Sequence, residues 1–569
     1  MQFHRGETDG VRTVWREEAG PLTAWLRFGV GRNEERLAES GITHAVEHLA
    51  LVGIGPQPYT WNGTVDGCSM NFWVSGEPAE VRSFLATVCS ALASLPSRRV
   101  LDELRVMQVE ESRKKPSQLG HDLALRYGAC GPGLMERPEF GLLHLRADRI
   151  QAWADQWCTS DNAVLVVRGT PPDGLTLPLP RGNPPDRREL SASSLHGRTW
   201  SAAQTDRVSL SVVGANDPAV VFGLEVTRER TFERLRTDLA VTYATTFTPV
   251  QLDATRWLLQ LTSDGRSDKA GTILRTMAEV LEEVTRAGPT MEELERTRAR
   301  WQRYIATDQG LDAALQGEAI CLLYDLPVRG PDDRQAQVQA LTPDQVGGAV
   351  ATTLDTLVAV GPRSLGGARP GWREPPKWSG AEVTGVKLSA VPEYTDGRLV
   401  IGNEGVSWVR NALQRRTVRW DSLAACLAWD DGKRTLVGDD GTEVVVSPWE
   451  WVSETVPGIT ETVDRYVDPA RRVPLGAGKG EPPVTHVAPT REVPTAVPAV
   501  AGSASAPRGW SPTPARQRSV LMICIPLLVV ASLVLAATIG AVGAVITVVL
   551  VVVIVVPLTQ WVMRRRRPG

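Results

Sequence analysis

The stretch that decides how the rest of the chain is interpreted is GITHAVEHL, residues 41–49. Residues four apart lie on one face of an α-helix, so His44 and His48 can hold one metal ion, with Glu47 beside them. Neutral imidazoles are good zinc ligands, and a catalytic zinc site has three protein ligands and one open position. The chain has only 7 histidines, so this spacing is rarely met by chance. The alternative is two histidines that cap or pack a helix.

A third ligand has to come from another part of the chain. Residues 97–113 have the pattern of a helix and offer Glu103, Glu110 and Glu111. One carboxylate from this helix would complete a set of two histidines and one glutamate, which favours zinc over other divalent ions. Zinc would lower the pKa of a bound water, and Glu47 would take its proton and pass it to a leaving amine.

Residues 1–360 resemble the pitrilysin/insulysin family of inverzincin zinc metallopeptidases, which includes mitochondrial processing peptidase. The motif itself carries the resemblance, together with TDGVR at residues 8–12 and GVGRNE at residues 29–34. These two stretches are similar to the family's opening strand and to the strand end that precedes its motif. The resemblance implies that the two motif histidines are zinc ligands and that the motif glutamate is the general base.

The family takes its third ligand from a helix of the form E-x-x-V-x-x-x-E, which the stretch ELRVMQVE at residues 103–110 fits. By resemblance, Glu110 is therefore the third ligand, and Glu103 is a second acidic residue near the site. Glu111 is the alternative third ligand if the match to the family's helix pattern is shifted by one residue. The segment after Leu51 is shorter than in the family, whose members carry an extra helix there.

The resemblance implies an α+β fold of two related halves that close like a clamshell, a catalytic half at 1–170 and a non-catalytic half at 196–362. An extended peptide would add to a sheet edge by strand pairing, and residues 62–74 are similar to that edge. In the second half, Arg236 and Tyr243 have the spacing at which relatives send an arginine and a tyrosine to the active site. They would bind the substrate backbone and stabilise the oxyanion.

Three further segments follow the two halves. Residues 386–470 contain short strands and Asp-Gly turns, which predict a small β-rich domain similar to a pleckstrin-homology barrel. Residues 476–517 are rich in Pro, Ala, Thr and Ser, as in a flexible linker. Residues 520–562 carry no charge and are long enough for two membrane spans. Arginines on both sides predict a hairpin with the peptidase halves in the cytosol of a bacterial inner membrane; the alternative is a single span.

Composition narrows the classes of function. The formal net charge of −3 gives no indication of a nucleic-acid partner. The 7 scattered cysteines favour a reducing compartment over a disulfide framework. We expect a zinc endopeptidase with Zn²⁺ as cofactor, a peptide or protein as substrate and the lipid bilayer as a partner through the hairpin. A non-catalytic peptide-binding or scaffold protein is the alternative, and a homodimer or a partner subunit is left open.

Overall fold

The structure is a computed structural model that describes residues 3–476 except 188, 191–194, 196, 364–370, 393 and 453–457. All of these residues belong to one compact unit, Met1–Thr490. The predicted hairpin at 520–562 and nearly all of the predicted linker at 476–517 lie outside the described residues. Among the residues that are described, no helix is long and apolar enough to cross a membrane.

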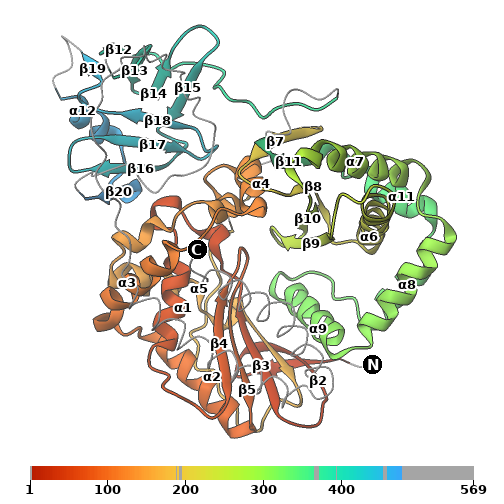
Figure 1. Ribbon diagram of the computed structural model, residues 1–569. Coiled ribbons are helices and arrows are strands. Elements are labelled where there is room, and N and C mark those ends of the chain that lie inside the picture. Colours follow the sequence, from red (N-terminus) through yellow and green to blue (C-terminus); the bar gives the residue numbers. More distant parts are fainter. Residues whose placement is uncertain are drawn as a thin grey trace, which may run out of the picture. The chain divides into compact units, whose positions relative to one another are not determined.

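Residues 1–170, the first of the two predicted halves, form a six-stranded sheet in the order β1-β2-β6-β3-β5-β4 (Figure 1). Only β2 and β6 pair in parallel. The central strand β6 reads AVLVVR and is buried along nearly its whole length, whereas β4 at the edge alternates polar and apolar residues. The strands are β1 (His4–Thr8), β2 (Val11–Arg16), β3 (Leu22–Phe28), β4 (Thr60–Val65), β5 (Met70–Gly76) and β6 (Ala163–Arg168).

Five helices accompany this sheet, and four of them share its main hydrophobic core. The motif helix α1 contacts the strands β4 and β5 on one side and the helices α2, α3 and α5 on the others. The helices are α1 (Ile42–Leu51), α2 (Pro78–Ala93), α3 (Val100–Glu111), α4 (Gln118–Tyr127) and α5 (Ala147–Trp157). The helix predicted at 97–113 is therefore present as α3, preceded by a 3-10 turn.

The second half forms a five-stranded mixed sheet in the order β7-β11-β8-β10-β9. Helices α6, α7 and α11 pack together beside it. The strands are β7 (Thr199–Ala203), β8 (Val208–Ala215), β9 (Thr245–Gln251), β10 (Arg256–Ser263) and β11 (Val358–Pro362). The helices are α6 (Pro218–Glu233), α7 (Ala270–Ala287), α8 (Met291–Ile305), α9 (Asp308–Leu323), α10 (Pro331–Ala340) and α11 (Pro343–Ala351).

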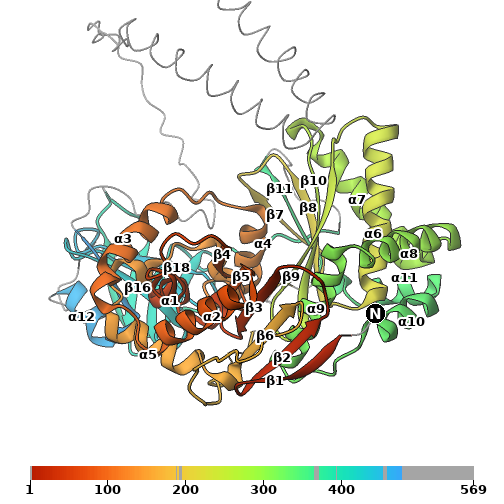
Figure 2. The ribbon, with the colours of Figure 1, turned by 90° about the horizontal axis from the view of Figure 1, so that it is seen from below.

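Helix α9 belongs to the second half in sequence but packs on the first sheet. Its residues Leu315, Ala319 and Leu323 lie against Val14 and Val166. Figure 1 shows α9 close to β2, and Figure 2 shows it beside both β2 and β6. Since α9 covers one face and the core with α1, α2 and α5 covers the other, the central strands β2 and β6 are buried on both faces.

The third part of the described chain is the β-rich region, residues 386–475. It contains a sheet ordered β15-β14-β13-β12-β19, a sheet ordered β18-β17-β16-β20 and the helix α12 (Ile459–Tyr466). Glycines with positive φ, Gly432 and Gly441, lie in two of the turns. The strands are β12 (Val386–Ala390), β13 (Arg398–Gly402), β14 (Gly405–Val409), β15 (Arg415–Arg419), β16 (Leu423–Trp429), β17 (Arg434–Gly438), β18 (Glu443–Val446), β19 (Trp451–Val452) and β20 (Arg472–Leu475).

Candidate metal centre

A buried carboxylate fixes the start of the motif helix. Gly41, at φ 90°, turns the chain into α1, and the backbone N–H groups of Gly41 and Thr43 donate to the two carboxylate oxygens of Glu35 at 2.8 and 3.0 Å. The indole of Trp153 donates to the Thr43 hydroxyl at 3.1 Å. Burial raises the pKa of Glu35 to about 7, although both backbone hydrogen bonds favour its charged form. These contacts fix the rotation of α1 and therefore the direction in which the motif side chains point.

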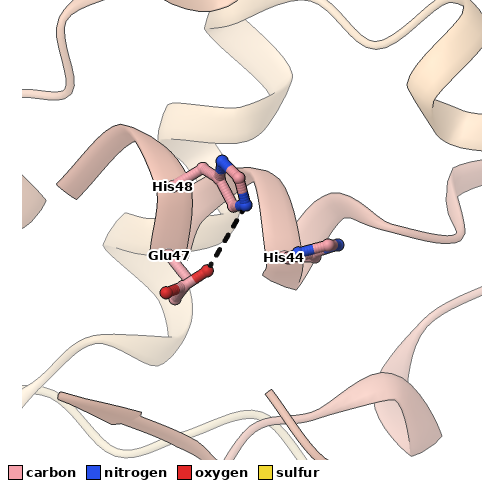
Figure 3. Close-up of side chains that lie close together, drawn as sticks. All are labelled: His44, Glu47 and His48. Carbon is pink, nitrogen blue, oxygen red and sulfur yellow. Dashed lines mark ion pairs between the residues drawn. The ribbon is translucent and has the colours of Figure 1, made fainter. Parts of the chain in front are cut away.

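His44, Glu47 and His48 converge at the same place on α1. One ligand atom from each of the three lies within 4.8 Å of the others, and the two imidazole rings meet edge to face at 4.8 Å between centroids. Figure 3 shows Glu47 with its carboxylate directed at His48, where the Oε2–Nε2 distance is 4.0 Å. The predicted grouping of these three side chains is thus present in the structure.

Each imidazole also has a carboxylate at its Nδ1 atom. His44 Nδ1 lies 3.0 Å from Glu139 Oε2, and His48 Nδ1 lies 3.5 Å from Glu103 Oε2. Burial is the largest single influence on His44 and lowers its pKa, but the hydrogen bond to Glu139 and the negative charges of Glu139 and Glu47 together outweigh burial, so the pKa is raised. Burial likewise raises the pKa of Glu139, but His44 and Arg32 outweigh it and the pKa is lowered. A carboxylate on one ring nitrogen fixes the imidazole and leaves the other nitrogen to bind a metal.

Glu47 is buried beside the edge strand β4. Gly63 of that strand comes so close that any side chain there would collide with the Glu47 carboxylate. Burial raises the pKa of Glu47, nearby Glu110 raises it further, and the two histidines oppose the change. A carboxylate with a raised pKa beside a metal site suits proton transfer near neutral pH.

The structure keeps the candidate third ligands on α3 but outside the cluster of ligand atoms. Glu110 is exposed and acts electrostatically on Glu47, while Glu111 lies 3.5 Å from the Lys114 ammonium. Glu103 is the α3 carboxylate that contacts a motif histidine. The three candidate carboxylates therefore lie on one helix next to the motif helix, and Glu103 is the one beside a motif histidine; the third ligand stays a prediction.

Arg236 and Tyr243 lie together in the second half. The Arg236 guanidinium is 5.4 Å from the centroid of the Tyr243 ring, and it donates to the Thr242 carbonyl at 3.4 Å. The backbone of Tyr243 donates to Asp264 at 2.7 Å, and the tyrosine side chain is 78% exposed. Within the described part of the chain, neither side chain forms a hydrogen bond or an ion pair with the motif helix.

Two residues of the site were not identified from the sequence. Glu139 follows His44 by 95 residues and Glu35 lies outside the motif, and neither belongs to a periodic pattern. Both carboxylates are buried. A buried charge with a specific partner often marks a functional site, but burial at these positions is visible only in the folded chain.

The first half therefore combines an α+β fold, a motif helix that carries His-x-x-Glu-His and a sheet edge at β4 next to that helix. No protein-family model matches the chain, and no curated protein matches it either. Solved structures of M16 proteins do match, and they confirm the expected resemblance at the level of the fold.

Three of these structures cover similar fractions of the chain. An inactive peptidase M16 domain from Pseudomonas fluorescens is 16% identical, with 64% of this chain and 98% of that chain covered and a TM-score of 0.53. A protease from Helicobacter pylori is 14% identical, with 63% and 99% covered and a TM-score of 0.54. The first half of the periplasmic protease PqqL from Escherichia coli is 14% identical, with 63% and 91% covered and a TM-score of 0.51.

Proposed function

We propose that this protein is a zinc-dependent endopeptidase that cleaves peptides or unfolded segments of proteins. The observation that carries the proposal is the arrangement on α1. Two histidines one turn apart each have a carboxylate at Nδ1, and a buried glutamate lies beside them. A pair of histidines that only packed or capped a helix would not need a carboxylate at each ring.

The donor set fits zinc. Two imidazoles and a carboxylate are a common catalytic zinc set, and the partners at Nδ1 support both rings. His44, His48 and Glu110 would hold the ion, with Glu111 as the alternative to Glu110. When bound, zinc supplies a Lewis acid that polarises a carbonyl and lowers the pKa of water.

The chain's own residues would supply proton transfer and substrate binding. Glu47 would take a proton from the attacking water and deliver it to the leaving amine. The free edge of β4 would pair with an extended peptide, and the approach of Gly63 to Glu47 would bring the bound backbone close to this base. Arg236 and Tyr243 would bind the peptide backbone and stabilise the oxyanion when the two halves close over it.

The test compares the wild-type chain with Glu47→Gln on a reduced and alkylated, permanently unfolded protein. We expect wild type to produce peptides that mass spectrometry detects, and Glu47→Gln to be at least about 10²-fold slower with its zinc content unchanged. Equal rates for the two proteins would contradict the role of Glu47 as general base.

The third ligand is tested separately on α3. We expect Glu110→Gln to weaken zinc binding strongly and the neighbouring change Glu111→Gln to leave it near the wild-type value, because one carboxylate completes the set. A loss of zinc binding only in Glu111→Gln would identify Glu111, and not Glu110, as the third ligand.

A non-catalytic peptide-binding or scaffold protein is the second candidate, because one of the matching structures is an inactive M16 domain and fold does not fix function. It predicts a purified protein that binds unfolded peptides with the same affinity with and without zinc and leaves them intact. The endopeptidase proposal predicts cleavage that stops when zinc is removed.

The proposal includes a membrane tether with the metal site on the cytosolic side. It rests on the sequence of 520–562, which is uncharged and has arginines on both sides. We expect the protein to sediment with membranes, and its peptidase halves to resist added protease in intact spheroplasts. Cleavage of these halves in intact spheroplasts would contradict the cytosolic orientation.

A further inference from the structure

Glu139, the carboxylate partner of His44, lies in a short irregular segment, residues 128–143. This segment contains the 3-10 turns η4 (Gly131–Glu136) and η5 (Phe140–Leu143), and Glu139 lies between them. Glu139 forms an ion pair with Arg32 in addition to its hydrogen bond with His44. Because Glu139 is buried and lies in neither a helix nor a strand, other contacts must hold its backbone in place.

The β-rich region supplies a large share of those contacts. Two residues before Glu139, the guanidinium of Arg137 donates to Glu443 at 2.7 Å and to the Gly441 carbonyl at 3.4 Å. The Arg137 side chain is fully buried in this contact. On either side of Arg137, Leu134 and Phe140 share a hydrophobic cluster with residues of β16, β17 and β20.

A backbone contact extends the same interface. The N–H of Ala129 donates to the Asp439 carbonyl at 2.9 Å. Gly128, at φ 62°, comes so close to Asp439 and Asp440 that a side chain would collide with their backbone. An arginine with two partners, an apolar cluster and a backbone hydrogen bond together make a fixed interface rather than a loose contact between neighbours.

We infer that the β-rich region is a structural part of the metal site, because it holds segment 128–143 so that Glu139 positions His44. The inference rests on the proposed metal centre and adds to it a positioning residue and a source of that positioning outside the two peptidase halves. Glu139 touches neither metal nor substrate and acts only through His44.

The chemistry of such outer partners sets the size of the effect. A carboxylate on one ring nitrogen fixes the tautomer and orientation of a ligating histidine and makes the other nitrogen more basic, and its loss typically costs about 10- to 100-fold in metal affinity. Glu103 holds His48 in a similar way from α3, so the loss of Glu139 would leave one histidine oriented and the other free to turn.

The first experiment measures the zinc dissociation constant of the full chain by competition with a chromogenic chelator. We expect Glu139→Gln to bind zinc about 10- to 100-fold more weakly than wild type. The control is Glu136→Gln on the same segment, whose carboxylate accepts from the Ser117 N–H and which should bind zinc like wild type. Equal affinity for wild type and Glu139→Gln would overturn the positioning role.

The second experiment tests the β-rich region with the pair Glu443→Ala and Glu404→Ala. Glu443 is the partner of Arg137, whereas Glu404 pairs with Arg419 at the surface. In metal-free protein, we expect Glu443→Ala alone to speed amide hydrogen exchange in residues 132–143. Its zinc affinity should fall between those of wild type and Glu139→Gln.

The outcomes separate this inference from the proposed function. Faster exchange with unchanged zinc affinity in Glu443→Ala would overturn the link between the β-rich region and His44, as would unchanged exchange. A wild-type chain that binds no zinc would overturn the proposed metal centre together with this inference. If wild type and Glu139→Gln both bind zinc with equal affinity, the inference about Glu139 is overturned but the proposed metal centre is not.

Discussion

The ion pair of Asp122 and Arg126 on α4 should be one of the most costly polar contacts to break. Neither side chain has any exposed surface, and they are 2.9 Å apart. Arg126 also donates to the Thr356 carbonyl at 2.7 Å and to the Ser211 hydroxyl at 2.8 Å, so it connects α4 to the second half of the chain. The change Asp122→Ala would leave the guanidinium buried without a counter-charge.

The expected cost follows from burial. Removing one partner of a buried ion pair destabilises a protein by about 3–5 kcal/mol. Since 1 kcal/mol shifts Tm by about 2–4 °C in a large domain, we expect Tm to fall by roughly 10 °C. The matched control is Asp102→Ala on α3. Asp102 and Arg105 are 3.8 Å apart with side chains 64% and 75% exposed, and such a pair contributes at most about 1 kcal/mol.

Thermal unfolding of the full chain, followed by calorimetry at neutral pH, measures both variants. The reasoning requires a drop in Tm for Asp122→Ala that is several times the drop for Asp102→Ala. Equal drops for the two variants would refute it, because burial would then not determine the cost of losing the carboxylate.

Three further changes test other parts of the structure. Burial raises the pKa of the Glu35 carboxyl from its usual 4.5 to about 7. The contribution of Glu35 to the stability of the fold is therefore fully present below pH 4.5 and is lost as the pH rises through 7. Urea unfolding should show a loss of about 3 kcal/mol over this range that is absent in Glu35→Gln, and identical pH profiles would contradict the shift. Gly128→Ala should lower Tm more than Gly174→Ala. Both glycines have positive φ, but a side chain at Gly128 would collide with the backbone of Asp439 and Asp440, whereas one at Gly174 would meet its nearest atom only at 3.8 Å. Equal losses of Tm would mean that backbone strain alone is responsible. Tyr243→Phe should lower kcat by about 10²-fold with Tm unchanged, because the ring is exposed; an unchanged kcat would remove Tyr243 from the proposed oxyanion site.

Local patterns predicted local structure well. The helix predicted at 97–113 is α3, and the predicted Asp-Gly turns lie at 431–432 and 440–441, where they join β16 to β17 and β17 to β18. These signals are read within a few residues of the chain and depend on backbone preferences there. The motif residues belong to the same class, because helical spacing alone brings them together.

Long-range contacts were harder to predict. The pairing of Glu139 with His44 and the return of α9 to the first sheet connect segments distant in sequence, and no residue pattern specifies either. A weak signal did exist in two strands. AVLVVR in β6 and LAACLAW in β16 are continuous apolar runs, which are typical of strands covered on both faces. They indicate that something must pack there, but they do not identify α9 or segment 128–143 as the partner.

The most direct test of zinc-dependent peptide hydrolysis is one cleavage assay on the purified chain with an unfolded protein as substrate. Activity is measured as purified, after removal of metal by a chelator, and after return of zinc, with Glu47→Gln carried through the same steps. We predict cleavage by wild type that disappears on chelation and returns with zinc, and none at any step in Glu47→Gln. Cleavage that persists without metal, or that Glu47→Gln retains, would contradict a metal centre on α1 as the origin of the activity.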